Sequence, residues 1–76
     1  MKINSFLQHF ADILDDTDAE LIQADTIFRD LDEWDSLTAL SLIAMADEEY
    51  EVKLTGDDIK NSKSLEEIFE IIKNKA

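Results

Sequence analysis

The sequence contains no proline and only one glycine, Gly56, and this feature restricts its fold most. Tight β-hairpin turns place residues at positive φ, which glycine tolerates best, so a hairpin-rich chain needs several such residues. The composition therefore argues against an all-β fold. With 76 residues, of which 45% are hydrophobic, we expect a single domain over residues 1–76 with one modest core.

Hydrophobic residues near the start of the chain recur at three- and four-residue steps, which indicates an amphipathic helix. The predicted buried stripe consists of Ile3, Phe6, Leu7, Phe10, Ile13 and Leu14. The only histidine, His9, lies off this stripe, and we expect it to be a solvated surface residue.

A long connection, from about Asp16 to Asp35, follows this helix. Thr17 and Glu20 have the spacing of a capping box, which predicts a short helical turn after Thr17. We expect five hydrophobic side chains to hold the connection to the core: Leu21, Ile22, Ile27, Phe28 and Leu31. Connections of this length are uncommon in compact domains and often carry function.

A second helix is predicted from about Ser36 to Glu51, with Asp35 or Ser36 as its N-terminal cap. It is apolar on two sides. One stripe suits the core: Ala39, Leu42, Ile43, Ala46 and Tyr50. The other is apolar and then acidic: Leu37, Leu40, Ala44, Asp47 and Glu48. This second stripe is either a docking surface or the side of a helix buried between two neighbours.

Two more helices complete the predicted fold. Thr55 caps a short helix from Gly56 to about Asn61, and Ile59 holds it to the core. The last helix opens with a capping box in which Ser64 is the cap. Its predicted buried stripe is Leu65, Ile68, Phe69 and Ile72. We therefore expect an all-α fold, an irregular four-helix bundle with three longer helices and one short helix.

The charge of the chain limits its partners. Nineteen acidic residues and seven basic ones give a formal net charge of −12. Such a chain repels nucleic acids and anionic membranes and favours partners with basic docking faces, although the acidity can also serve solubility alone. The longest apolar run, residues 42–46, is too short to span a bilayer, and no signal peptide opens the sequence. We expect a cytoplasmic protein.

The sequence offers little for catalysis or metal binding. It has no cysteine and one histidine, so disulfides and cysteine or histidine metal sites are not expected. A catalytic Ser36 would need a base beside it. A calcium loop that starts at Asp30 needs glycine at its sixth position and glutamate at its twelfth, where the chain has Asp35 and Ser41. A hydrolase and an EF-hand are both disfavoured.

Three segments resemble acyl carrier proteins, and the resemblance spans essentially the whole chain. The triplet 35–37, Asp-Ser-Leu, resembles the signature of that family. Residues 28–31, Phe-Arg-Asp-Leu, resemble its upstream Phe-x-x-Leu segment. Residues 47–50, Asp-Glu-Glu-Tyr, resemble the acidic end of its second helix.

The resemblance implies a non-catalytic carrier. In this family a magnesium-dependent phosphopantetheinyl transferase attaches 4′-phosphopantetheine from coenzyme A to the serine, here Ser36, and acyl or aminoacyl groups are held on it as thioesters. Asp35 and Leu37 would flank the attachment point. The resemblance gives Leu37, together with Leu40, Asp47 and Glu48, as partner contacts for activating ligases and synthases. A monomer is expected.

Several departures from the family pattern concern the pathway. Family members usually have a glycine two or three positions before the serine. In this chain that glycine is missing, and the segment there is Asp32-Glu33-Trp34. Thr38 and Ser41 stand where carriers of fatty acid synthesis usually have acids. The pathway alternatives are fatty acid, polyketide or related biosynthesis, and a dedicated acyl or aminoacyl carrier. An acidic binding module without the arm is a further reading. We expect Trp34 either to pack over the loop or to contact partners or the arm.

Overall fold

The computed structural model describes residues 2–15 and 17–76, and within them the chain forms four α-helices. They are α1 (Ile3–Asp12), α2 (Ser36–Tyr50), α3 (Gly56–Lys60) and α4 (Leu65–Lys75). No strand occurs in this part of the chain, only an isolated bridge between Ile27 and Ser64. The predicted all-α bundle of three longer helices and one short helix is confirmed.

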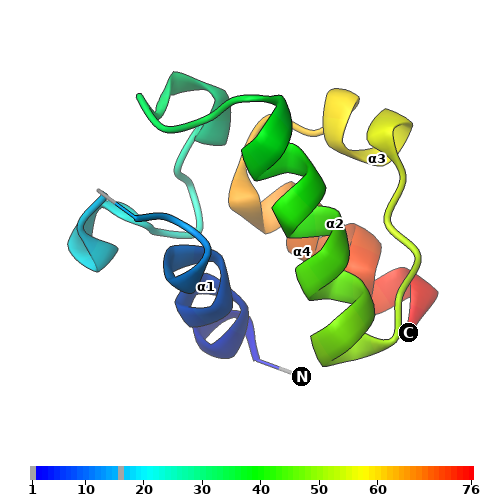
Figure 1. Ribbon diagram of the computed structural model, residues 1–76. Coiled ribbons are helices and arrows are strands. Elements are labelled where there is room, and N and C mark those ends of the chain that lie inside the picture. Colours follow the sequence, from blue (N-terminus) through cyan, green and yellow to red (C-terminus); the bar gives the residue numbers. More distant parts are fainter. Residues whose placement is uncertain (1, 16) are drawn as a thin grey trace.

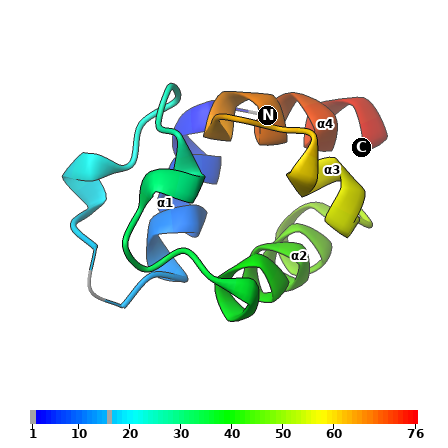
Figure 2. The ribbon, with the colours of Figure 1, turned by 90° about the horizontal axis from the view of Figure 1, so that it is seen from above.

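The helices surround one core. Seen from above, α1, α2 and α4 lie around it, and α3 closes the side between α2 and α4 (Figures 1 and 2). The rings of Phe6 and Phe69 join α1 to α4, with their centres 5.6 Å apart. The stripes predicted for α1 and α4 are confirmed, because their members are buried or packed against the core. The buried hydrophobic residues are Phe6, Phe10, Leu14, Ile22, Phe28, Leu42, Met45, Ala46, Val52, Leu54, Ile59, Leu65, Ile68, Phe69 and Ile72.

The loop between α1 and α2 contains the predicted short turn, a 3-10 helix over Ala19–Leu21. The predicted capping box is wrong. The turn begins after Asp18 without a side-chain cap, because the hydroxyl of Thr17 instead donates a hydrogen bond to the carboxylate of Glu33. Asp16, where the predicted connection begins, lies outside the described residues.

Only part of the predicted hydrophobic anchoring of this loop is correct. Ile22 and Phe28 are buried, and Leu31 is partly buried against the core. Leu21 and Ile27 expose 61% and 43% of their surface, so the prediction is wrong for these two. The backbone turns each of them outward next to a residue that does pack inward.

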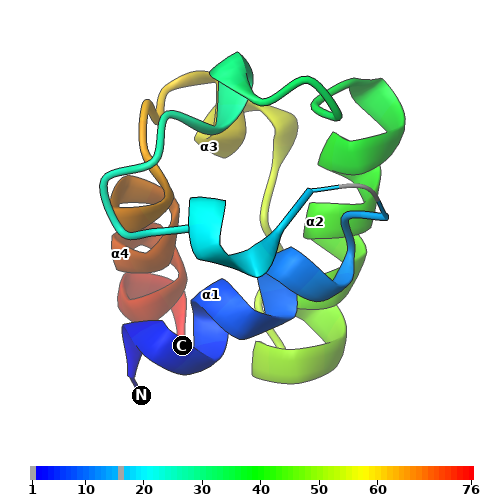
Figure 3. The ribbon, with the colours of Figure 1, turned by 90° about the vertical axis from the view of Figure 1, so that its left-hand side faces the viewer.

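The loop passes beside the start of α4 (Figure 3), and polar contacts fix it to the second half of the chain. The first amides of α4, from Leu65 and Glu66, donate hydrogen bonds to the carbonyls of Thr26 and Ala24. A second 3-10 turn, Phe28–Asp30, was not predicted. Its arginine, at position 29, donates hydrogen bonds to three carbonyls at the end of α3, those of Ile59, Lys60 and Ser62.

Side-chain caps define the starts of three helices. Asp35 caps α2, Thr55 caps α3 as predicted, and Ser64 forms the capping box predicted for α4. Thr55 also forms a capping box with Asp58, which was not predicted. The end of α2 comes one residue earlier than predicted, because Glu51 adopts a left-handed conformation with φ of 55°. Glycine usually occupies this position at a helix end.

Candidate functional site

Ser36 is the first residue of α2, and the neighbouring Asp35 caps that helix start. The Asp35 carboxylate accepts a hydrogen bond of 2.8 Å from the Thr38 amide. It also lies 3.0 Å from the Thr38 hydroxyl. These hydrogen bonds, the amide first, hold the pKa of Asp35 below its usual value. Of the two predicted caps, Asp35 is therefore the correct one.

Ser36 itself is exposed, and its hydroxyl makes no hydrogen bond to any of the described residues. The hydroxyl of a serine at a helix start most often caps the helix by accepting a backbone hydrogen bond. Because Asp35 already fills that role, the Ser36 hydroxyl is accessible to another molecule at the positive end of the helix dipole.

The turn that leads into Ser36 is held from two sides. The Thr38 hydroxyl lies 2.9 Å from the carbonyl oxygen of Glu33, inside the loop. The Glu33 carboxylate accepts hydrogen bonds from the Asp15 amide at 2.8 Å and from the Thr17 hydroxyl at 2.6 Å. Glu33 thus joins the segment just after α1 to the start of α2. Sequence reasoning did not single out Glu33, because the signal is a contact between residues sixteen and eighteen positions apart.

Trp34 packs over the loop, one of the two alternatives predicted for it. Its ring lies 4.7 Å from that of Phe28 and is stacked on Phe10 at 6.4 Å, centre to centre. The side chain is partly buried against the core. Trp34 therefore anchors the segment directly before Ser36 to the hydrophobic core.

Helix α2 presents its second apolar stripe to solvent. Leu37 and Leu40 expose 73% and 61% of their surface. Ala44, Asp47 and Glu48 are exposed as well. The reading in which α2 is buried between two neighbours is wrong, because only one side of the helix meets the core. We call these five residues the α2 face: Leu37, Leu40, Ala44, Asp47 and Glu48.

The core side of α2 agrees with the predicted stripe. Leu42 and Ala46 are fully buried, and Ala39, Ile43 and Tyr50 pack against the core at its edge. Met45 is buried too and was missed. On the α2 face, Asp47 pairs with Lys53 at 3.0 Å, with both groups well exposed.

His9 is not the freely solvated residue that the sequence predicts. Its ring lies edge-on to Tyr50 at 5.9 Å, and its Nε2 is 3.5 Å from the Glu49 carboxylate. The side chain keeps 35% of its surface exposed. His9 lies at the far end of α2 from Ser36, so the two side chains are not brought together.

The described residues contain no group of three or more histidines, cysteines and carboxylates arranged to hold a metal ion. Among them, no helix is both long enough and apolar enough to cross a membrane.

Comparison with known proteins identifies the family. The family described as "Phosphopantetheine attachment site" matches residues 4–72. The searches of curated proteins and of solved structures found no significant match. Domains of this kind carry covalently attached 4′-phosphopantetheine, are generally non-catalytic, and interact with phosphopantetheinyl transferases and biosynthetic enzymes. The match covers nearly the whole sequence, and the chain therefore belongs to the family of phosphopantetheine-binding carrier proteins.

Proposed function

We propose that Ser36 is the attachment residue and that residues 1–76 act as one carrier domain. The observation that carries this proposal is that Asp35, and not Ser36, caps α2. Asp35 caps α2 through the Thr38 amide, which leaves the exposed Ser36 hydroxyl without a hydrogen-bond partner among the described residues. A hydroxyl in this state can be modified without loss of the helix cap.

The surroundings of Ser36 fit a phosphopantetheine group. The group is joined to the protein through a phosphodiester, and the N-terminus of a 15-residue helix complements a negative charge. The Asp35 carboxylate is directed to Thr38, which fixes it in the cap. Once attached, the group supplies the thiol that this cysteine-free chain lacks.

Catalysis by Ser36 itself is not supported. The only histidine in the sequence, His9, contacts Glu49 and Tyr50. Glu49 is thirteen residues along α2 from Ser36, which at 1.5 Å per residue is about 20 Å. A serine nucleophile needs its base within hydrogen-bonding distance. A carrier serine does not, because the transferase supplies the activation.

The α2 face supports the partner part of the proposal. Leu37 and Leu40 expose apolar surface beside Ser36, and Asp47 and Glu48 add negative charge farther along the helix. An apolar centre with a charged rim is typical of transient protein interfaces. We propose that transferases, ligases and synthases with basic docking patches bind here. Self-association is disfavoured, because two copies with a charge of −12 repel each other.

For the pathway, we propose a dedicated acyl or aminoacyl carrier. The support is the residues of the first turns of α2, where Thr38 and Ser41 replace the acids usual in carriers of fatty acid synthesis. In the structure Thr38 has a local role, since it binds both Asp35 and Glu33. An acidic binding module without the arm is the second candidate, because the α2 face alone would also suit it.

The test is intact mass spectrometry after incubation with coenzyme A, Mg²⁺ and a broad-specificity phosphopantetheinyl transferase. We expect wild type to gain the mass of one arm and Ser36→Ala to gain none. Ser41→Ala is the matched control, because it removes another exposed serine hydroxyl of α2 and leaves the turn at Ser36 in place. A wild-type chain that stays unmodified with several transferases would leave the binding module as the better description. An arm that persists in Ser36→Ala would assign the attachment to another residue.

A further inference from the structure

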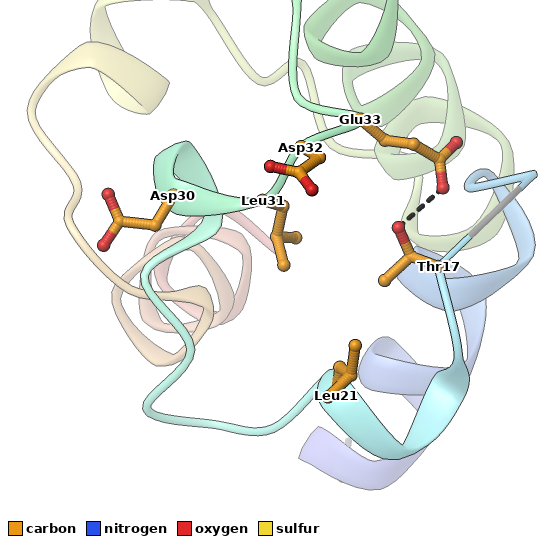
Figure 4. Close-up of a pocket in the computed structure, with 6 residues that line it drawn as sticks. All are labelled: Thr17, Leu21, Asp30, Leu31, Asp32 and Glu33. Carbon is orange, nitrogen blue, oxygen red and sulfur yellow. Dashed lines mark hydrogen bonds between the residues drawn. The ribbon is translucent and has the colours of Figure 1, made fainter.

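The three residues directly before Ser36 form a turn, and each of them is held by a contact of its own. The Glu33 carboxylate reaches across the loop to the hydroxyl of Thr17, as Figure 4 shows. The ring of Trp34 packs against the core. Asp35 caps α2. The chain therefore arrives at Ser36 along a path that three different side chains fix.

Thr38 closes this turn from the other side of Ser36. Its hydroxyl lies 2.9 Å from the carbonyl oxygen of Glu33 and 3.0 Å from the carboxylate of Asp35. Both oxygens are acceptors, so the single proton of the hydroxyl is shared between them. The Thr38 amide donates a further hydrogen bond of 2.8 Å to Asp35. These contacts run from one side of Ser36 to the other and enclose its backbone.

The two hydroxyls differ in what they present to a partner. Ser36 is exposed, whereas Thr38 is half-buried and directs its hydroxyl back into the turn. Residues two positions apart on an α-helix lie about 200° apart around its axis. An enzyme that reaches Ser36 and the α2 face therefore has no need to contact the Thr38 hydroxyl. Any influence of Thr38 on Ser36 acts through the backbone of the turn.

We infer that Thr38 and Glu33 are positioning residues for arm transfer. They hold the backbone at Ser36 so that its hydroxyl meets the phosphopantetheinyl transferase in one orientation. Thr38 acts through its hydroxyl, and Glu33 acts through both its carbonyl oxygen and its carboxylate. This inference rests on the proposed function, in which Ser36 receives the arm.

The chemistry of the transfer makes this orientation matter. The Ser36 oxygen forms a bond to the phosphorus of coenzyme A that bears the pantetheine, and the bond from that phosphorus to the bridging oxygen of the pyrophosphate breaks. Adenosine bisphosphate leaves with the electron pair, and the hydroxyl proton goes to a base of the transferase. The attacking and leaving oxygens lie roughly in line in such a displacement. A serine on a loosened turn spends less time in that position, which lowers kcat.

The first test needs no arm and measures the mobility of the turn. Thr38→Val removes the hydroxyl at nearly constant shape and retains the amide that caps α2, whereas Thr38→Ser retains the hydroxyl. In NMR relaxation of the isotope-labelled protein, we expect the order parameters of amides 33–37 to fall in Thr38→Val and in Glu33→Ala. Thr38→Ser should resemble wild type. Unchanged order parameters in both loosened variants would overturn the inference.

The second test measures arm transfer by the broad-specificity transferase. We expect Thr38→Val to lower kcat about fivefold or more with little change in KM, and Thr38→Ser to recover most of kcat. The double variant with Glu33→Ala should lose little more than the worse single variant, because both act on one turn. If Thr38→Val does not fold, Glu33→Ala and its conservative partner Glu33→Gln give the same comparison. Asp58→Asn is the control, since it weakens a remote contact with Lys75 and should leave kcat unchanged.

The possible results separate the inference from the proposed function. Unchanged kcat in Thr38→Val and Glu33→Ala, with the arm still attached to Ser36, would overturn the inference and leave the proposed function intact. A raised KM at constant kcat would also overturn it, because Thr38 would then be a docking contact. No arm on wild type would contradict the proposed function instead. The relaxation comparison would still decide whether Thr38 and Glu33 fix the turn.

Discussion

The carboxylate of Glu33 lies 2.6 Å from the hydroxyl of Thr17 and accepts its hydrogen bond. The same carboxylate accepts a second bond, of 2.8 Å, from the amide of Asp15. This one side chain, three residues before the proposed attachment serine, therefore joins the end of the long loop to the segment just after α1. Since Trp34 packs on Phe10 next to it, the loop is held by both polar and aromatic contacts.

Glu33→Ala should loosen this closure. Loss of two hydrogen bonds to a charged acceptor should lower the free energy of unfolding by about 1–2 kcal/mol, measured by urea denaturation. Hydrogen exchange at the Asp15 amide should become faster. Glu33→Gln retains an oxygen acceptor and should recover most of the loss. Equal stability of the alanine variant and wild type would show that the closure contributes nothing.

Arg29 should be a second strong contributor to stability. Arg29→Ala removes the guanidinium donors to the carbonyls of Ile59, Lys60 and Ser62, of which Ile59 keeps its hydrogen bond from the Ser62 amide. It also removes a cation 4.9 Å from the Phe28 ring. We expect a loss of about 2–3 kcal/mol in urea denaturation. Arg29→Lys should recover less than half of it, since an ammonium group cannot reproduce the planar fork of donors. Full recovery by lysine would mean that charge alone matters.

The positions and order of the helices could be predicted, because the sequence patterns that mark them are local. Apolar periodicity marks α1 and α4, and the Ser64 capping box marks where α4 begins. The exposed α2 face could also be predicted, because a helix with two apolar sides in a small bundle can bury only one of them. These patterns depend on spacings of three or four residues, which the sequence displays directly.

The loop could not be predicted to the same degree. Thr17 has the spacing of a cap, yet its hydroxyl binds Glu33, sixteen residues away. Leu21 and Ile22 are equally apolar neighbours, and only the backbone path decides which one is buried. The Arg29 contacts with α3 arise from the same long-range folding of the loop. A single sequence contains no periodicity that reports such contacts.

The left-handed residue at the end of α2 offers a stabilising substitution. Glu51 has a φ of 55°, a conformation that costs a residue with a Cβ atom about 1 kcal/mol. Glu51→Gly should raise the free energy of unfolding by about 0.5 kcal/mol after the entropy that glycine loses on folding. The matched control is Glu48→Gly, inside the helix, which should lower it by about 1 kcal/mol. A loss of stability in both variants would contradict the strain at Glu51.

Asp58 should make folding sensitive to acid. The Lys75 ammonium, at 2.7 Å, and then the Thr55 amide hold the pKa of Asp58 below its usual value near 3.9. The folded-state pKa thus lies below the unfolded one. The stabilisation is complete above about pH 5 and is lost as the pH falls through the unfolded-state and then the folded-state value.

Asp58→Asn should therefore flatten the decline in unfolding free energy between about pH 5 and pH 3. The control is Asp57→Asn, a neighbouring acid of the same helix turn whose side chain makes no contact with Lys75. Its acid profile should follow that of wild type. If Asp58→Asn and Asp57→Asn give the same profile, the ion pair with Lys75 does not contribute to acid sensitivity. The measurement is chemical denaturation at a series of pH values.

The acidic end of the α2 face should govern how fast and how tightly basic partners bind. Glu48 tests this better than Asp47, because Asp47 already pairs with Lys53 and its replacement would also break that contact. Glu48→Lys should raise the KM of a phosphopantetheinyl transferase several-fold at an ionic strength of about 0.1 M, where charges interact over about 10 Å. At about 1 M, where that distance falls to about 3 Å, the effect should shrink to less than about twofold.

The control must change the net charge equally without touching the α2 face. Asp25→Lys does so, since Asp25 is an exposed acid of the loop. Each variant replaces a charge of −1 by +1 and takes the formal net charge from −12 to −10. If attraction depends on overall charge alone, both variants will raise KM to the same extent at low salt. If the α2 face binds the partner, Glu48→Lys will raise KM more than Asp25→Lys, and the difference will disappear at high salt. A difference that persists at both ionic strengths would mean that Glu48 acts through close packing and not through its charge.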